Sequence, residues 1–389
     1  MDASDCDVAS TNWSHWHGIP WQDAHQVVGR LQARIANAAK AGDWRKARRL
    51  QKLLTRSISA KALAVKRVTE NQGRKTPGID RQTWSTPDEK WQAVQSLQHK
   101  GYQPRPMRRV YIPKANGDRR PLGIPTMRDR AMQALHLLAL DPTAETTGDI
   151  HSYGFRRGRS TADAIEQVRN ALGRKHSPQW VLEADIKGCF DNISHDWLIA
   201  HVPMDKGVLR KWLKAGYFEG NNLFPTESGT PQGGIISPVL ANLALDGLQD
   251  VLAGLFRTVR EARSAKVNFV RYADDFIITG SSRELLEDRV KPLVQDFLRE
   301  RGLELSEKKT LVTHVTDGFD FLGWTVRWQG GMLLTKPSRK NVKNFLAKVR
   351  GTLRDMRTSR QADVIDKLNP VIRGWANYHR SQMATRTFA

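Results

Sequence analysis

The sequence predicts an α+β protein in which a small sheet with acidic residues lies between helical, basic segments. Two apolar segments in the centre of the chain, 181–186 and 269–279, are predicted to be strands because β-branched and aromatic residues cluster in them. Before and after this centre, apolar residues recur at helical spacing with lysine and arginine between them. The pattern therefore indicates strands in the middle of the chain and helices towards both ends.

The composition is that of a globular protein that works inside a cell. The 389 residues are 39% hydrophobic and 26% charged, and a chain of this length can form two or three domains with buried cores. Two cysteines, Cys6 and Cys189, are too few for a disulfide scaffold. The apolar runs are shorter than a membrane span, and no apolar segment at the N-terminus is typical of a signal peptide. We therefore expect a cytoplasmic protein with no membrane partner.

The positive charge is unevenly distributed along the chain. There are 62 Lys and Arg against 40 Asp and Glu, a net charge of +22. Residues 30–75 carry a net charge of +12, 101–160 of +6 and 336–389 of +10, whereas 161–335 holds 21 basic and 23 acidic groups. Basic segments attract polyanions through phosphate contacts and counterion release. We expect these basic segments to bind nucleic acid and the near-neutral centre to serve another purpose.

The basic N-terminal part is predicted to form three amphipathic helices. They are expected to begin near Val27, Trp44 and Ser59, where apolar residues start to recur at helical spacing. Glycine and proline interrupt the pattern after Thr69, so 71–80 is predicted to be a loop.

A hairpin and two further helices are predicted next. Residues 108–113 are expected to form a strand, Asn116-Gly117 its turn and 120–125 the returning strand. A helix rich in Met, Ala and Leu is expected over 128–140, and Ser160 is expected to cap the start of another helix.

The centre is predicted to contain a second hairpin, followed by helices. Two short strands are expected to meet at Ala273-Asp274. A helix is expected behind them over 285–297, where Leu, Val and Phe recur at helical spacing. Beyond Lys336 the chain is expected to be helical again, with a last helix over 364–378.

Three aspartates in strand contexts are the candidates for catalysis. Asp185 ends one predicted strand, and Asp274-Asp275 lies at the turn between the next two. Acidic groups are costly to bury unless they are paired or bind a cation, and adjacent aspartates repel each other. Carboxylate oxygens are the ligands that Mg²⁺ prefers. Two Mg²⁺ ions held there would activate a 3′-hydroxyl and stabilise a pyrophosphate leaving group.

The three aspartates, together with the residues that flank them, resemble motifs of the reverse transcriptases. Tyr272-Ala-Asp-Asp275 between apolar strands is similar to the signature of that family. Asp185-Ile-Lys-Gly-Cys-Phe190 is similar to its strand-to-helix motif, and 229–238 to the start of its dNTP-binding helix. The resemblance implies a right-hand polymerase fold, with fingers, a palm that contains an antiparallel sheet, and a helical thumb.

The resemblance also implies roles for single residues. Asp185, Asp274 and Asp275, with the backbone near Ile186, would hold two Mg²⁺ ions. Phe190 would lie beneath the sugar of the incoming nucleotide and exclude a 2′-hydroxyl. The other residues implied are Lys114, Arg120 and Gln232 for dNTP binding, Lys308 or Lys309 for protonating the pyrophosphate, and Phe321, Leu322, Gly323 and Trp324 for the primer grip.

Within this family, the chain most resembles the proteins encoded by bacterial group II introns. The Gln-Gly-Gly at 232–234 and the block 21–80 are similar to that branch, and 369–378 is similar to the start of its maturase or thumb domain. Because members usually continue further, we expect a chain truncated in or after this domain. The residues expected to bind intron RNA are Arg30, Arg34, Arg45, Lys46, Arg48, Arg49, Lys52, Arg74 and Lys75.

The resemblance implies four parts and one main function. We expect an N-terminal extension of RNA-binding helices (1–80), fingers (81–180), a palm (181–335) and the start of a thumb or maturase domain (336–389). The expected protein is an RNA-directed DNA polymerase that binds its intron RNA, assists splicing and copies the intron at a nicked DNA target. Its partners would be intron RNA, the DNA target or primer and dNTPs, and it would join the nucleoid when acting on DNA. Two alternatives stay open: a non-polymerising RNA-binding splicing factor, and a CRISPR-associated or defence reverse transcriptase.

Overall fold

The computed structural model describes residues 13–113, 117, 119–230, 233–384 and 387. The chain divides into two compact units, each assembled from separate stretches of sequence. Within the described residues, no helix has both the length and the apolar character needed to cross a membrane. Unit 1 comprises Met1–Gly148, Gly188–Asp246 and Glu300–Leu303, and unit 2 comprises Asp149–Lys187, Gly247–Arg299 and Glu304–Ala389.

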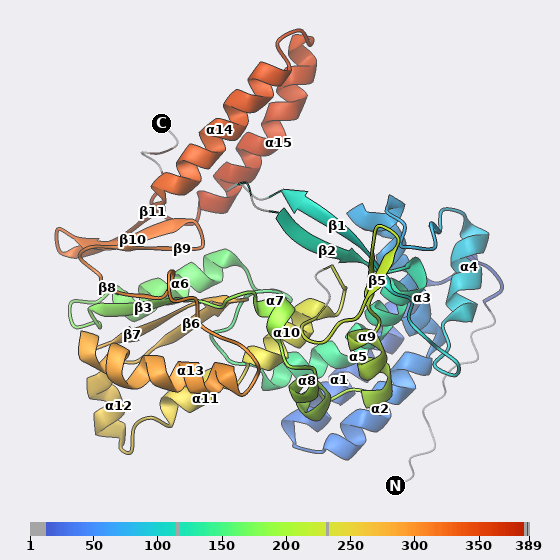
Figure 1. Ribbon diagram of the computed structural model, residues 1–389, viewed down its shortest axis with the longest axis horizontal. Coiled ribbons are helices and arrows are strands. Elements are labelled where there is room, and N and C mark those ends of the chain that lie inside the picture. The colour runs from blue at the N-terminus through green and yellow to red at the C-terminus, as the bar shows by residue number, and fades with distance from the viewer. Residues whose placement is uncertain (1–12, 114–116, 118, 231–232, 385–386, 388–389) are drawn as a thin grey trace. The chain divides into compact units, whose positions relative to one another are not determined.

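Unit 1 is mainly helical and contains a four-stranded sheet in the order β2-β1-β4-β5 (Figure 1). Strand β1 pairs antiparallel with β2, which confirms the two predicted strands, and parallel with β4. Asn116 of the predicted turn lies outside the described residues. The elements are η1 (Trp16–Gly18), α1 (Trp21–Lys40), α2 (Trp44–Arg56), α3 (Ile58–Glu70), η2 (Gln72–Lys75), α4 (Pro87–Ser96), β1 (Met107–Pro113), β2 (Arg119–Ile124), α5 (Met127–Thr147), α7 (Cys189–Asn192), α8 (His195–His201), α9 (Lys206–Leu213), β4 (Tyr217–Glu219), β5 (Asn222–Phe224) and α10 (Ser237–Leu245).

Unit 2 contains two sheets and helices that pack on them. The larger sheet has the order β6-β7-β3-β8, with every pair antiparallel, and the smaller has the order β11-β10-β9. The elements are α6 (Thr161–Leu172), β3 (Trp180–Asp185), α11 (Leu248–Ala253), α12 (Val259–Ala265), β6 (Phe269–Tyr272), β7 (Asp275–Gly280), the π-helix η3 (Leu285–Val290), α13 (Lys291–Arg299), β8 (Leu311–His314), β9 (Phe319–Phe321), β10 (Trp324–Gln329), β11 (Met332–Pro337), α14 (Arg339–Asp355) and α15 (Gln361–His379).

The three predicted N-terminal helices are confirmed, but the first begins earlier than expected. Helix α1 starts at Trp21 rather than Val27, because Ala24 continues its buried stripe one turn before Val28. Helix α2 begins where Asp43 accepts a hydrogen bond from the backbone N–H of Lys46 at 2.9 Å. The predicted loop after α3 contains the short 3₁₀ turn η2.

Helix α5 is longer than predicted, because it continues through a proline. The expected end near residue 140 is wrong: the helix runs to Thr147 with Pro142 inside it. Proline removes the backbone donor that would bond to the carbonyl four residues earlier, here that of Leu138. The side chain of Gln32 on α1 donates to that carbonyl at 2.8 Å, so a tertiary contact replaces the lost helical bond.

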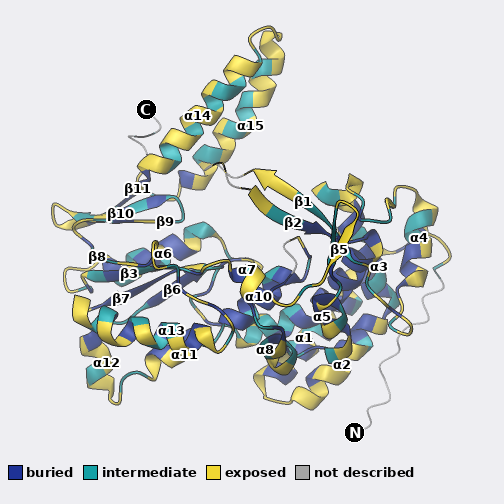
Figure 2. Ribbon diagram, in the orientation of Figure 1, coloured by how far each residue is buried: buried dark blue, intermediate teal, exposed yellow. Residues whose placement is uncertain are grey.

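The larger sheet of unit 2 is covered on both faces. Val181 of β3 and Ile277 of β7 belong to a core cluster that includes Val168 of α6 and Trp324 of β10. The π-helix η3 contacts β3 and β7, and Leu286 lies close to Gly280. Residues 285–290 were predicted to be α-helical, and the structure corrects this to a π-helix that leads directly into α13. Buried strands between these layers appear dark blue in Figure 2.

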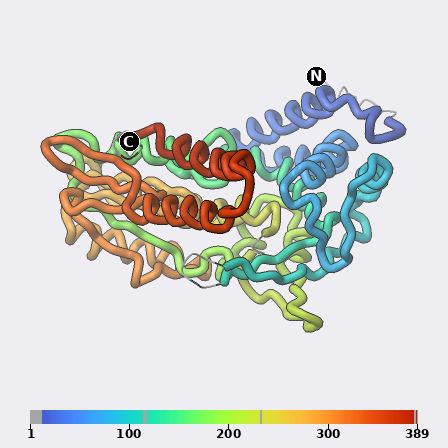
Figure 3. The backbone as a smooth tube through the Cα atoms, turned by 90° about the horizontal axis from the view of Figure 1, so that it is seen from above, coloured from blue at the N-terminus to red at the C-terminus, as the bar shows by residue number. Residues whose placement is uncertain are grey.

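The C-terminal part of unit 2 is a helical hairpin joined to the smaller sheet. The predicted helices are confirmed as α14 and α15, which run side by side (Figures 1 and 3). They are held together by Phe345 stacked on Trp375, with ring centroids 4.4 Å apart. At the base of the hairpin, the ring of Trp324 lies 4.3 Å from that of His379. No residue of α14 is buried.

A buried histidine links α5 to its neighbours in unit 1. The ring of His136 packs edge-on against His99 and Trp212, with centroids 5.0 and 5.2 Å apart. Its burial, reinforced by His99, lowers the pKa of His136 to about 3, although Asp205 opposes the shift. The folded protein therefore keeps His136 neutral at pH values where the unfolded chain, with an ordinary pKa near 6.5, binds a proton.

Replacing His136 by phenylalanine is expected to weaken the pH dependence of stability. Between pH 6.5 and about 3 the unfolded chain binds one more proton at this residue, so the wild type loses stability as the pH falls through that window. From pH 7 to pH 5 this residue accounts for a loss of about 2 kcal/mol. Urea unfolding at the two pH values measures it, with His25→Phe on the exposed side of α1 as the control. An unchanged pH dependence in His136→Phe would contradict this account.

Candidate active site

The register of the larger sheet brings two aspartates face to face. Asp185, the last residue of β3, is directly opposite Asp275, the first residue of β7. Because side chains alternate along a strand, Asp185 lies on the same face as Val181, and Asp275 on the same face as Ile277. Asp274 precedes β7 in the tight turn from β6. The three predicted carboxylates therefore gather at one end of the sheet.

The turn that carries Asp274 has an unusual backbone. Ala273 has φ of 58°, in the left-handed region that residues with side chains seldom adopt. Gly154 packs against this turn so closely that a Cβ on it would lie 2.3 Å from the backbone N of Ala273. Only glycine fits at 154 without displacing the aspartate turn, a requirement that the sequence analysis missed.

Lysine and mutual repulsion set the electrostatics of the three aspartates. Lys309 Nζ donates to both carboxylate oxygens of Asp185, at 3.0 and 3.1 Å. Partial desolvation, together with repulsion from Asp274 and Asp185, raises the pKa of Asp275 to about 6, and Lys309 acts in the opposite direction. Asp275 keeps an exposed surface, so repulsion is the cause that the geometry supports most directly. Among the described residues, Lys308 makes no hydrogen bond or ion pair with any of the three.

The donor set suits a hard divalent cation. Among the described residues, no three Asp, Glu, His or Cys side chains are grouped as a ready-made metal site. The three aspartates nevertheless offer only oxygen donors, which are the ligands that Mg²⁺ prefers. A cation there would also relieve the repulsion that raises the pKa of Asp275.

A buried arginine and a buried aspartate that attract each other lie behind the aspartate turn. Arg271 of β6 is fully buried, and its guanidinium donates to the carbonyl of Ala273 at 3.4 Å. Asp149, also buried, interacts electrostatically with Arg271 and accepts a hydrogen bond from the backbone N–H of Gly247 at 2.9 Å. The backbone N–H of Arg271 donates to the carbonyl of His151 at 2.9 Å. Sequence reasoning did not find this support, although an arginine inside an apolar strand was a signal for a buried partner.

The candidate nucleotide residues belong to unit 1. Phe190 is half-buried and lines a pocket of about 230 Å³ together with Arg109 and Tyr217. The backbone N–H of Thr230 donates to the carbonyl of Phe190 at 2.6 Å, which attaches the segment before α10 to this pocket. Arg120 lies exposed on β2. Lys114 and Gln232 lie outside the described residues.

The residues predicted for the primer grip form a turn between β9 and β10. Phe321 and Trp324 are buried in the core of unit 2, whereas Leu322 and Gly323 have positive φ values of 50° and 79°. The hydroxyl of Tyr378 on α15 donates to the carbonyl of Leu322 at 2.8 Å. The carbonyl of Gly323 accepts a hydrogen bond from the backbone N–H of Ser338 at 2.9 Å, so both carbonyls of the turn are engaged and the two aromatic rings anchor it in the core.

All nine residues predicted to bind RNA have exposed side chains in unit 1. Arg30 and Arg34 lie on α1, and Arg74 and Lys75 on η2. Helix α2 carries the remaining five and has no acidic residue in its sequence; these five are Arg45, Lys46, Arg48, Arg49 and Lys52.

Comparisons with known proteins match three regions of the chain. Residues 112–326 match the family described as reverse transcriptase (RNA-dependent DNA polymerase). Residues 16–97 match the N-terminal domain of reverse transcriptase, and 342–389 match the maturase-specific domain of group II introns. The order of the three matches is the order expected from the sequence motifs.

Two curated proteins and one solved structure are similar to the chain. The group II intron-encoded protein LtrA of Lactococcus lactis subsp. cremoris is 32% identical over 68% of this chain and 54% of its own length, so the chain spans about half of that relative. Protein YkfC of Escherichia coli K12 is 30% identical over 86% of this chain and 98% of its own length. A telomerase structure from Candida albicans, in complex with a fragment of telomeric RNA, is 15% identical over 71% of this chain and 54% of that chain, with a TM-score of 0.45.

Removing the buried cation behind the aspartate turn is expected to destabilise the protein strongly. Arg271→Met leaves Asp149 buried without its charge partner, a change that costs about 3–5 kcal/mol in comparable buried pairs. Asp149→Asn in the same chain should restore part of the loss, and urea unfolding measures both effects. The control is Arg283→Met, which breaks an exposed 2.9 Å pair with Glu287 and should cost about 0.5 kcal/mol or less. Equal small losses in the two arginine variants would show that Arg271 does not stabilise the turn through a buried pair.

Proposed function

The chain belongs to the reverse transcriptase family, in the branch encoded by group II introns, and on that premise we propose that it is an RNA-directed DNA polymerase that also binds its own intron RNA. Acting in the bacterial cytoplasm, it would assist splicing of that RNA and copy it into DNA at a nicked DNA target. The main observation behind the proposal is that Asp185 of β3 lies directly opposite Asp275 of β7, with Asp274 in the adjoining turn.

The three aspartates are proposed to bind two Mg²⁺ ions, with the backbone near Ile186 as a further donor. Reverse transcriptases generally use divalent metal ions, and an all-oxygen donor set at the end of a sheet agrees with this use. When bound, such ions lower the pKa of a 3′-hydroxyl and stabilise the pyrophosphate leaving group. The chain itself orients the carboxylates: the register opposes Asp185 to Asp275, and the left-handed Ala273 turns Asp274 towards them.

Lys309 is proposed as the proton donor to the leaving pyrophosphate. The sequence left Lys308 and Lys309 as equal candidates. Lys309 reaches Asp185 with its ammonium group, so it lies where the reaction is proposed to occur. Because two thirds of its side chain is exposed, at 67%, the ammonium group can turn from Asp185 towards a phosphate oxygen.

The dNTP is proposed to lie against Phe190. Phe190 shares its pocket with one cation, Arg109 of β1, and with two acids, Asp191 and Glu227. The proposal rests on the aromatic surface of Phe190 beside Arg109. We assign Phe190 to the exclusion of a 2′-hydroxyl, and Lys114, Arg120 and Gln232 to contacts with the triphosphate and base. The turn formed by Phe321, Leu322, Gly323 and Trp324 is assigned to the primer. We propose, with these roles, fingers at 81–180, a palm at 181–335 and a thumb beginning at 336.

The exposed basic residues of α1, α2 and η2 are proposed to bind the intron RNA. Such a surface recognises RNA mainly through its shape and phosphates. The relative LtrA is itself a group II intron-encoded protein, and the maturase-specific match at 342–389 favours a part in splicing. A splicing factor without polymerase activity is disfavoured, because such a protein gains nothing from three like charges held together at the end of two inner strands.

Replacing two of the aspartates is expected to abolish DNA synthesis but not RNA binding. Asp274→Ala with Asp275→Ala should lower primer extension on poly(rA)/oligo(dT) with Mg²⁺ by at least about 1,000-fold, the scale typical of lost catalytic electrostatics. Binding to the intron RNA, measured by filter retention, should stay within about twofold, since the RNA surface is assigned to unit 1. The control is Glu287→Ala with Asp288→Ala, which removes two acids from η3. If the wild type extends no better than the double variant, the polymerase proposal is wrong.

The two candidate proton donors are expected to differ in effect. Lys309→Gln removes the contact with Asp185 and should lower kcat by about 10²-fold or more, the usual contribution of general acid catalysis. Lys308→Gln makes the same chemical change one residue away and should lower kcat by less than about tenfold. Single-nucleotide incorporation under rapid mixing separates kcat from dNTP affinity. Equal effects on kcat would remove Lys309 from the proposed role.

A further inference from the structure

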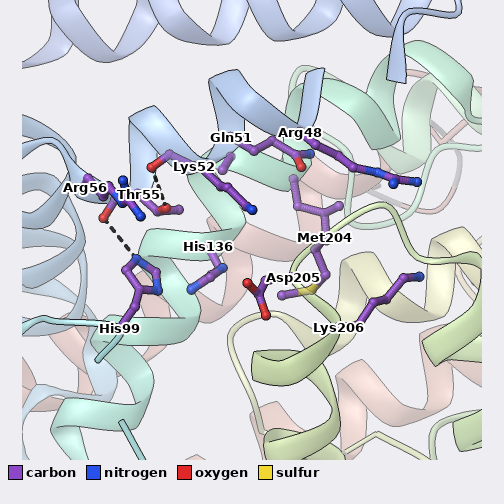
Figure 4. Close-up of a pocket in the computed structure, with 12 residues that line it drawn as sticks. Arg48, Gln51, Lys52, Thr55, Arg56, His99, His136, Met204, Asp205 and Lys206 are labelled. Carbon is purple, nitrogen blue, oxygen red and sulfur yellow. Dashed lines mark hydrogen bonds between the residues drawn. The ribbon is translucent and has the colours of Figure 1, made fainter. Parts of the chain in front are cut away.

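Unit 1 contains a pocket that the proposed polymerase chemistry does not use. It has a volume of about 380 Å³, which is within the range of small-ligand sites. It lies between α2, α5 and the segment that connects α8 to α9 (Figure 4). The lining from α2 consists of Arg48, Gln51, Lys52, Thr55 and Arg56, whose spacing places them on one face of the helix.

Three cations form a row along the rim of this pocket. Arg48, Lys52 and Arg56 are four residues apart in sequence, so they follow one side of α2 over about 12 Å. All three are exposed, and none makes an ion pair with a carboxylate among the residues that the structure describes. Like charges at this spacing destabilise a helix by a few tenths of a kcal/mol per pair. An anion bound along the row would remove that repulsion.

A fourth cation stands across the pocket, beside a single acid. Lys206 Nζ donates to the carbonyls of Ala200 and Val202 at 3.0 and 2.8 Å, which holds its charge near Arg48. Asp205 also lines the pocket, and its carboxylate accepts a hydrogen bond from the backbone N–H of Val208 at 3.0 Å, which caps α9. The acid is thus engaged with its own helix, and the pocket keeps an excess of positive charge.

The floor of the pocket, which α5 and Met204 line, is apolar except for one buried nitrogen. Ala139, Leu140 and Met204 are buried and contribute hydrocarbon and sulfur surface. His136 is 5% exposed, and its Nε2 has no hydrogen-bond partner among the described residues. A buried polar atom without a partner costs about 1–3 kcal/mol, so a ligand that pairs with it binds more tightly.

We propose that this pocket binds one unpaired nucleotide of an RNA strand. The base occupies the apolar floor with its polar edge against His136 Nε2, and the phosphates before and after it follow the row from Arg48 to Arg56. A row of about 12 Å is longer than one phosphate needs, which favours a strand over a free mononucleotide. This inference rests on the proposed RNA binding by α1 and α2, and it adds that recognition there involves a single-stranded base.

Two charge-reversal variants on the same helix test the phosphate contacts. Arg48→Glu with Lys52→Glu changes two cations that line the pocket, and Arg45→Glu with Arg49→Glu makes the same change on the same helix outside it. The probe is a fluorescein-labelled uridine trinucleotide, with anisotropy measured on the full chain and circular dichroism as the check on folding. The pocket variant should bind at least about tenfold more weakly than the control variant, because it alone loses direct phosphate contacts. Equal losses would overturn the pocket while leaving general RNA binding by α2 intact.

A neutral substitution tests the base contact. His136→Phe keeps a ring of similar shape and removes the nitrogen, so affinity for the trinucleotide should fall about 3- to 10-fold, the value of one hydrogen bond. An abasic trimer with the same phosphates should bind the wild type and His136→Phe equally. If the substitution weakens binding of the abasic trimer as much as that of the uridine trimer, the base contact is overturned.

Competition tests whether the pocket binds a strand. If uridine monophosphate or inorganic phosphate competes as well as the unlabelled trinucleotide, the pocket is not a site for a strand. If neither charge-reversed protein loses affinity for the intron RNA, the proposed RNA binding by α2 itself fails.

Discussion

Repulsion between carboxylates that the sheet register forces together is the constraint on which the rest of unit 2 depends. Directly opposed residues on antiparallel strands have Cβ atoms about 4.5–5.5 Å apart, and like charges in such positions destabilise the pair. Asp185 and Asp275 occupy these positions, with Asp274 in the adjoining turn. The sheet tolerates them because β3 is an inner strand, paired with both β7 and β8, and because Val181 and Ile277 anchor it in the core. The free energy that stabilises the acids comes from residues a few positions away along the same strands.

The support behind the turn follows from the same constraint. The turn must adopt a left-handed conformation at Ala273, and such a conformation persists only where its surroundings determine it. Gly154 presses against it from one side, and the guanidinium of Arg271 reaches the carbonyl of Ala273 from within the core. A buried arginine in turn requires a buried acid, which explains Asp149. One group of acids at the end of the sheet thus determines the identity of several residues that are buried behind it.

The central strands of the chain could be predicted from its sequence far better than its packing. The strands predicted at 108–113 and 120–125 and those on either side of Ala273 are local patterns, and the structure confirms them. The catalytic role of the three aspartates stays a prediction. The predicted end of α5 was wrong because Gln32, more than a hundred residues away, replaces the hydrogen bond that Pro142 removes. The short strands β8 to β11 were not predicted, because segments of three to six residues show too few alternations to reveal a period. The pocket beneath α2 was equally out of reach, since its lining comes from four separate segments.

The excess of cations has different consequences in different parts of the chain. With a net charge of +22, the protein cannot pair every Lys and Arg with an acid of its own. Near the aspartates the chain supplies the acid, and Lys309 is held by Asp185. Along α2 it supplies none, so Arg48, Lys52 and Arg56 keep their charges exposed beside an apolar floor. A cation paired within the protein gains little from a polyanion, whereas an unpaired one gains both attraction and released counterions. Cations that lack a nearby carboxylate therefore indicate the nucleic-acid surface better than the number of cations does.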